Sequence, residues 1–506
     1  MSKQRRGRGV GSRLCGLAIA GALASASAAQ DAGFEGPSFT GVPRSPTESK
    51  PESKLWFNDG SWWGSLWSVS DQAFQIHRLD QTTHTWMDTG VEIDSRPDSH
   101  SDTLWDGSKL YVLTHDFSTT GGAPGDPLLI LRFGYDPATD AYTLDADFPV
   151  TIADSSSEAA VLAKDSTGTL WAVWIQDLRV HFSHTQGSDT SWSAPAIHPR
   201  STSDVDTDDI CSVIRYAGNR IGVLWSDQVE DEYFFSFHAD GEEPGVWSPV
   251  ELAWPGQVDD HIHLAADSAG RVFAALKNAS DDIVLAVRTS GAWQQFPVTA
   301  GADLFSRPIV LLDEEDRVIH VIAKVGAAVS GGTINRKKSS LDAIGFDLGA
   351  GDVIMDDADA PNINDPTSTK QNLDGSTGLV VLAQNATTEQ YWHNEIPGTP
   401  RGVFFHGPPL PGIAGVDNSI TVTGATPKRL VFFLVGHQLG TTQLLQCQVT
   451  LGLARPFQLL GIRRADGNGV ATLSVFVPDA VAGMTFHFQA LELFSCEPSN
   501  VVSEQF

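Results

Sequence analysis

The chain has 506 residues and a formal net charge of −29 at pH 7, because 62 Asp and Glu outnumber 33 Lys and Arg. A surface this acidic repels the phosphates of nucleic acids and the headgroups of anionic lipids, so we expect neither as a partner. Beyond the N-terminus, no apolar segment approaches the roughly 20 residues that a transmembrane helix needs, so we expect no membrane span.

The first 29 residues have the pattern of a signal peptide. A basic head that ends at Arg13 precedes a short apolar run, Leu14–Leu23, and small residues then offer cleavage sites near Ala28 or Ala29. The pattern predicts a secreted protein, released to the extracellular space or the periplasm. We expect the mature chain to be soluble and monomeric.

Seven copies of one pattern fill residues 53–394. Each copy opens with a small or acidic residue and a charged one, continues as an apolar strand, turns at Asp or Gly, and continues as a second apolar strand. In the third copy, Ser157-Glu158 opens the pattern, the turn is Asp165-Ser-Thr-Gly168, and Leu-Trp-Ala-Val-Trp follows. The turns recur roughly every 50 residues, the length of a four-stranded blade with its loops. This repeat predicts an all-β fold, a seven-bladed β-propeller.

Two segments flank the predicted propeller. Residues 30–52 precede it, and their part from Phe39 to Pro51 could supply the last strand of the seventh blade and so close the circle. Residues 395–412 are rich in Pro and Gly, which is typical of a linker.

Residues 413–506 predict a small C-terminal β-sandwich of Ig-like type, which we expect to be an accessory module. Its expected strands are Ser419–Val422, Leu430–Val435, Ala471–Val477 and Thr485–Leu491. Cys447 and Cys496 lie in this region and could pair in an oxidising compartment. Cys211 is left over, and its apolar neighbours predict a buried thiol.

The repeats resemble those of secreted sialidase-like (BNR-type) β-propellers of bacterial exported proteins. The resemblance covers roughly residues 53–394 and is carried by strings such as Asp259-Asp260-His261-Ile-His263 and Thr367-Ser-Thr-Lys-Gln-Asn372. Two features depart from the sialidases themselves. The Asp165–Trp171 turn joins the two innermost strands instead of the outer pair, and Arg307 is the only arginine where sialidases have a three-arginine clamp. The resemblance therefore implies the fold and not sialidase activity.

A charged residue opens each predicted inner strand. Because inner strands line the channel of a propeller and their starts share one face, these side chains should form a ring at one mouth, where ligand pockets form. Carboxylates come from blades two to four, and cations from blades six, seven and one. Either this mouth binds an anionic ligand, or the opposite charges pair and cap the channel. In blade order the residues are Lys54, Asp102, Glu158, Asp209, His261, Arg307 and Lys370.

An acidic glycan is the expected ligand, and three functions remain open for it. A glycoside hydrolase would use Glu158 as the acid and Asp102 or Asp209 as base or nucleophile, while Lys54, Arg307 and Lys370 bind a uronate, sialate or sulfate. A polysaccharide lyase would use the same cations and take His261 or His263 as its base. The third function is binding of a glycan or protein without catalysis.

No cofactor or metal is expected, although acidic loops offer oxygen ligands of the kind that calcium prefers. The first is the alternating Asp204, Asp206 and Asp208, and the second runs from Asp356 to Asp365. His261 and His263 lack an evident third zinc ligand. Trp62 and Trp63 either stack on sugar rings or pack between blades.

Overall fold

The computed structural model describes residues 33–48, 50–119, 126–256, 258–326, 332–398, 404–426, 429–444, 449–466, 469–492 and 496–506. The predicted signal peptide lies outside these ranges. Within them the chain is all-β, and its only helical elements are two 3₁₀ turns, η1 (Gly301–Asp303) and η2 (Asp479–Val481). No helix in the described part has the length and apolarity to cross a membrane.

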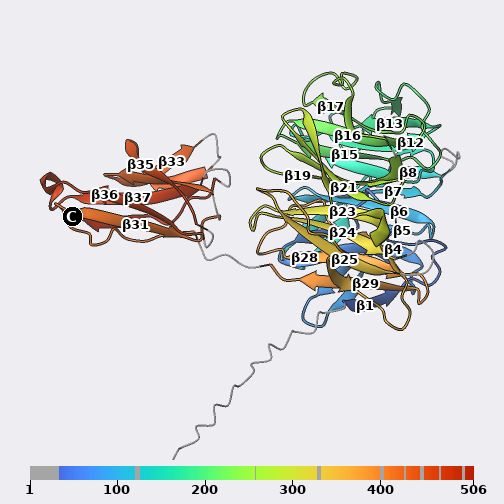
Figure 1. Cartoon of the computed structure of the whole chain (residues 1–506), viewed down its shortest axis with the longest axis horizontal. Helices are drawn as coiled ribbons and strands as arrows, with labels where there is room; N and C mark the ends of the chain where they lie inside the picture. Colours follow the sequence, from blue (N-terminus) through green and yellow to red (C-terminus); the bar gives the residue numbers. More distant parts are fainter. Residues whose placement is uncertain are drawn as a thin grey trace, which may run out of the picture.

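Seven small antiparallel sheets form from residues 34–396, one for each predicted repeat (Figure 1). The first contains β2 (Leu55–Asn58), β3 (Ser61–Ser68), β4 (Ala73–Asp80) and β5 (Thr85–Asp94). The second contains β6 (Ser99–Trp105), β7 (Lys109–Asp116), β8 (Pro127–Asp136), β9 (Ala141–Leu144) and β10 (Val150–Asp154). The third contains β11 (Ala160–Lys164), β12 (Leu170–Gln176), β13 (Arg179–His184) and β14 (Ala196–Ile197).

The next three sheets repeat this order of strands along the chain. The fourth contains β15 (Cys211–Tyr216), β16 (Arg220–Asp227), β17 (Glu232–Ala239) and β18 (Glu251–Pro255). The fifth contains β19 (Val258–Ala266), β20 (Val272–Asn278), β21 (Ile283–Thr289) and β22 (Ala292–Pro297). The sixth contains β23 (Phe305–Asp313), β24 (Val318–Val325), β25 (Thr333–Ser340) and β26 (Asp352–Met355).

The seventh sheet joins the two ends of this region. Its order is β27 (Ile363–Thr367), β28 (Leu379–Asn385), β29 (Gln390–Ile396) and then β1 (Phe34–Ser38) from the N-terminus. The closing strand therefore lies just before the Phe39–Pro51 segment in which the sequence placed it. Gly36 permits the pairing, because a Cβ at that position would lie 3.2 Å from Tyr391 on β29. The pairing covers an edge of β29 that would otherwise be open.

Hydrogen bonds connect neighbouring sheets at their innermost strands. Thr103 N in the second sheet donates to Ser53 O beside the first (2.8 Å), and Leu55 N in the first donates to Ser368 O after β27 (3.0 Å). The first and seventh sheets are thus neighbours, as in a closed circle. Trp62 and Trp63 are fully buried in the core around the first sheet, which favours packing between sheets over sugar stacking.

The seventh inner strand departs from the repeat. The sequence pattern opened it at Thr369-Lys370, whereas β27 covers Ile363–Thr367 and Lys370 follows it. The sequence Asn364-Asp365-Pro366 reads as a turn, yet an innermost strand has one unpaired edge, where proline is tolerated. A register shift between Asn364 and Thr367 accommodates it.

The C-terminal region forms three further sheets from its own strands. Four of these strands, β31, β32, β36 and β37, coincide with the four expected ones, and β30 lies inside the predicted linker. The strands are β30 (Phe405–His406), β31 (Asp417–Thr423), β32 (Leu430–Gly436), β33 (Leu439–Leu444), β34 (Val449–Leu453), β35 (Phe457–Arg464), β36 (Ala471–Phe476), β37 (Thr485–Glu492) and β38 (Val502–Gln505).

The cysteines separate into two kinds. Cys496 takes part in a disulfide, and its expected partner Cys447 lies outside the described residues. Cys211 is free and fully buried, as its apolar neighbours predicted, and burial raises the pKa of its thiol. A buried thiol with a raised pKa is a poor nucleophile.

Candidate ligand-binding site

Residues 50–54, which we call the strap, cross the end of the channel at which the inner strands start. Lys50 Nζ donates to Glu158 Oε1 before β11 (3.0 Å) and contacts the carboxylate of Asp260 on β19. Glu52 accepts a hydrogen bond from the backbone N of Ala160 (3.0 Å) and lies 2.6 Å from His115 Nε2 on β7. These contacts reach the second, third and fifth sheets, so the strap lies across this opening.

The seven predicted ring residues pair with opposite charges or backbone donors at this end. Five are buried, and the side chains of Arg307 and Lys370 are 22% and 20% exposed. The pairing corresponds to the alternative in which opposite charges cap the channel. The contacts are Lys54 with Glu52 (2.6 Å), Asp102 with Lys370, Glu158 with Lys50, Asp209 with the backbone N of Asp206 and Gln228 (2.7 and 3.0 Å), His261 with Asp260 (2.7 Å), and Arg307 with Asp365 (2.5 Å).

The pKa values of the carboxyl groups in this cluster shift in opposite directions. Burial raises the pKa of Glu158 to about 7, and the nearby charge of Asp260 adds to this, while Lys50 opposes it. Asp260 itself is buried, yet its contacts with His261 and Lys50 hold its pKa well below the ordinary value. Glu158 thus has the pKa of a general acid, but Lys50 of the strap occupies the position beside it.

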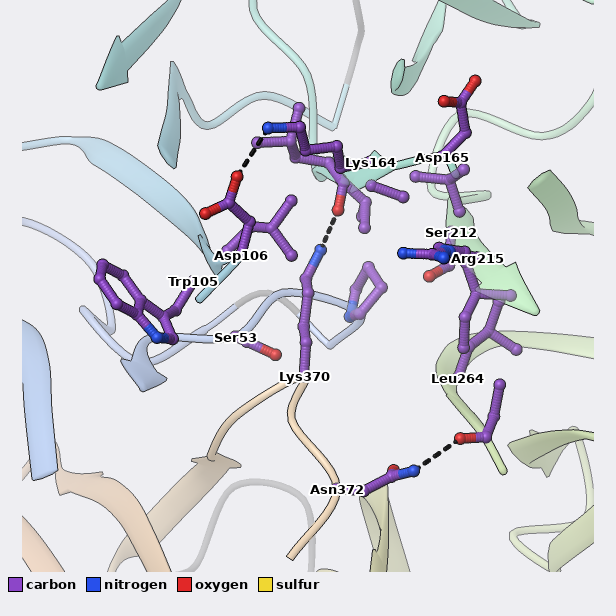
Figure 2. Close-up of a pocket in the computed structure, with 18 of the residues that line it drawn as sticks. Ser53, Trp105, Asp106, Lys164, Asp165, Ser212, Arg215, Leu264, Lys370 and Asn372 are labelled. Carbon is purple, nitrogen blue, oxygen red and sulfur yellow. Dashed lines mark hydrogen bonds and ion pairs between the residues drawn. The ribbon is translucent and has the colours of Figure 1, made fainter. Parts of the chain in front are cut away.

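A cavity of 480 Å³ occupies the channel on the other side of these pairs. It is lined by residues of β6, β11, β15 and β19, by Lys370 and Asn372 after β27, and by Pro51 and Ser53 of the strap. Figure 2 shows several of these side chains. The predicted site residues that the cavity brings together are Lys370 and His263, with Asp102 directly behind Lys370. Lys54, Glu158, Asp209, His261 and Arg307 are not among its lining residues.

Lys370 extends into the middle of this cavity (Figure 2). Its ammonium donates to Leu162 O (2.5 Å) and pairs with Asp102, which is fully buried. Asp102 also accepts hydrogen bonds from the backbone N–H groups of Ser53 and Leu162 (2.9 and 2.7 Å). Burial raises the pKa of Asp102, and Lys370 offsets part of that effect. An ammonium has three N–H donors, so a third is available to a ligand in the cavity.

His263 contributes a neutral ring. Burial lowers its pKa to about 3, and the charge of Lys370 acts in the same direction. Its Nδ1 accepts a hydrogen bond from Val310 N (3.2 Å), so the proton of the neutral ring is on Nε2. The ring can therefore donate to a ligand, and this tautomer leaves Nε2 without the lone pair that a base needs.

Several further polar residues of the cavity lie toward the ends of the inner strands and were not predicted as a site. Arg215 is exposed at the end of β15, and Trp105 is half-buried at the end of β6. Asp106 forms an ion pair with Lys164 (2.6 Å). A sequence signal was available: these residues follow the opening charged residue of their copy by three to six positions. An inner strand runs along the channel, so residues three to six positions after its start lie toward the opposite mouth.

Comparisons with known proteins add structural neighbours of low sequence identity. No protein-family model matches the chain, and no curated protein matches it significantly. The structure is similar to BP39L lectin from Burkholderia pseudomallei (TM-score 0.49, 10% identity, covering 69% of this chain and 98% of the lectin). It is also similar to the polysaccharide lyase Uly1 (TM-score 0.40, 10% identity, 70% and 91% covered) and to an α-L-arabinofuranosidase from Podospora anserina (TM-score 0.31, 11% identity, 58% and 90% covered). At these TM-scores the similarities do not decide an activity.

Proposed function

We propose that this chain is an exported seven-bladed β-propeller with a C-terminal β-sandwich, and that it binds an anionic carbohydrate in the channel cavity. Binding without catalysis was the third function left open by the sequence, and the geometry of the cavity favours it. The acidic group of the ligand, a carboxylate or a sulfate, would lie at Lys370. The sandwich would act as an accessory module, and the chain would act as a monomer.

The observation that carries this proposal is the ammonium of Lys370 inside a cavity lined mostly by neutral groups. Nε2 of His263 and the backbone around Ser53 and Ser212 supply further polar atoms, and Arg215 supplies a second cation at the open end. The ring of Trp105 packs against Tyr135 and Tyr142, so it supports the wall of the cavity. The cation and the donors together form a site suited to a charged sugar.

Catalysis is less well supported by the same geometry. A glycoside hydrolase needs two carboxyl groups on either side of the scissile bond. Of the three proposed carboxylates, Asp102 lies behind Lys370, Glu158 contacts the strap, and Asp209 accepts backbone hydrogen bonds next to β15. A lyase needs a base beside the uronate, and the tautomer of His263 makes that ring a donor.

Calorimetric titration with acidic and neutral oligosaccharides tests the proposal. We expect the wild-type chain to bind an oligogalacturonate or a sulfated oligosaccharide, and to bind cello-oligosaccharides weakly. Arg215→Ala should weaken binding of the acidic ligand about tenfold, since a hydrogen bond to a charged group contributes about 1.5 kcal/mol or more. The double variant Asp102→Asn/Lys370→Met, which removes both charges of the buried pair, should weaken it further.

Arg179→Ala is the matched control, because Arg179 pairs with the exposed Asp204 (2.7 Å) away from the cavity. It should leave the affinity unchanged. Equal affinity of the wild type and of both cavity variants would refute the site. Release of reducing ends or of unsaturated uronates by the wild type would replace the binding function with a hydrolase or a lyase.

A further inference from the structure

A second cluster of potential ligands lies apart from the cavity residues, where the strap meets the second sheet. Glu52, His100 and His115, which we call the buried triad, are 1%, 3% and 0% exposed. Each offers one ligand atom, and these atoms lie within 4.8 Å of one another. His100 on β6 and His115 on β7 are directly opposite each other in the strand register, and their rings meet edge to face at 6.0 Å.

The hydrogen bonds of His115 specify which ring nitrogen faces the carboxylate. Nδ1 lies 3.2 Å from the backbone O of Asp116, and Nε2 lies 2.6 Å from Glu52 Oε1. A carbonyl oxygen can only accept, so a proton on Nδ1 satisfies the first contact. Nε2 of a neutral ring then presents its lone pair to a carboxylate oxygen, and two acceptors at this distance repel each other. In this tautomer the contact requires a cation, either a second proton on the ring or a metal ion bound to both atoms.

The carboxylate is oriented by groups outside the triad. Lys54 Nζ donates to Glu52 Oε2 (2.6 Å) and to Ser101 O (2.7 Å), while Ala160 N donates to Oε1 (3.0 Å). Outer contacts of this kind, a backbone carbonyl on the distal histidine nitrogen and donors on the carboxylate, are those that orient ligands in metal sites. The contact of Lys54 with Oε2 leaves Oε1 directed at His115.

We propose that the buried triad binds a divalent transition metal, zinc by ligand type, through Nε2 of His115, one ring nitrogen of His100 and Oε1 of Glu52. Two imidazoles and one carboxylate suit zinc better than they suit calcium or magnesium, which prefer oxygen ligands. Because the triad joins residue 52 to β6 and β7, the ion would fasten the strap to the second sheet. The buried triad is separate from the two acidic loops in which the sequence offered oxygen ligands for calcium.

Metal analysis of the full-length chain, purified without chelators, is the direct test. We expect close to one equivalent of zinc by mass spectrometry, and visible absorption bands when the metal is replaced by cobalt(II). Removing the metal with a chelator should lower the Tm, and adding back zinc should restore it. These measurements use the wild-type protein, so they do not depend on any variant folding.

His115→Asn and Glu52→Gln should reduce the bound zinc at least tenfold and abolish the effect of zinc on the Tm. His320→Asn is the matched control, since His320 is a buried histidine on β24 in the sixth sheet. The His320→Asn variant should retain about one equivalent of zinc. Wild-type protein that contains no zinc, gives no cobalt bands and keeps its Tm when zinc is added would overturn the proposal, and the contact of His115 with Glu52 would then be a hydrogen bond alone. Neither outcome bears on ligand binding at Lys370.

Discussion

Lys50→Ala is expected to lower the free energy of unfolding by about 3 to 5 kcal/mol, the usual effect of removing one partner from a buried ion pair. The side chains of Lys50, Glu158 and Asp260 are only 7%, 8% and 11% exposed, and the one ammonium contacts both carboxylates. Without it, two buried carboxylates face each other across the strap. Denaturant unfolding of the wild type and the variant, followed by fluorescence, measures the difference.

Lys338→Ala is the matched control for this prediction. Lys338 pairs with Asp352 at 3.2 Å, but the two side chains are 50% and 43% exposed, so we expect a loss of less than about 1 kcal/mol. Equal, small losses for both variants would mean that Lys50 does not bridge the two carboxylates. The strap would then not be anchored over the start of the inner strands.

Glu48 and Glu158 are each expected to contribute less to the stability of the fold as the pH rises from about 5 to about 8. Burial raises the pKa of each from 4.5 to about 7, with Asp365 adding to the effect at Glu48 and Asp260 at Glu158. A carboxyl group whose pKa is higher in the folded than in the unfolded chain stabilises the fold while it is protonated. That stabilisation is complete below pH 4.5 and is lost as the pH rises through 7.

Glu158→Gln should remove one of the two contributions, up to about 3 kcal/mol at pH 8, because each pKa unit corresponds to about 1.4 kcal/mol. The amide keeps an oxygen acceptor for Lys50. We expect the Tm of the variant relative to that of the wild type to increase as the pH rises, with the largest difference above pH 7. The control is Glu92→Gln at an exposed position, whose pH profile should parallel the wild type. A parallel profile for Glu158→Gln would show that Glu158 is ionised across this range.

The site shows which inferences depend on contacts between distant residues. The sequence pattern identified Glu158 as an opening charged residue. It did not indicate that Lys50, 108 residues before Glu158 and 210 before Asp260, would pair with both carboxylates. Lys370 reached the cavity because its side chain crosses the channel to Asp102, 268 residues away in sequence. The sequence pattern marks the start of each inner strand, whereas Arg215 and Trp105 lie toward the other end of their strands, beside the cavity.

The sequence by itself determined the all-β class, the seven repeated strand groups and four strands of the C-terminal region, because alternating apolar residues and Asp or Gly turns are local signals. Tertiary structure decided the closing strand, since Phe34–Ser38 has no strand pattern and pairs only because β29 offers an open edge. It also decided which mouth is covered and which holds a cavity. Both depend on the path of the strap across three sheets. Ion pairs between distant residues hold the strap there, and such pairs leave no periodic pattern in a sequence.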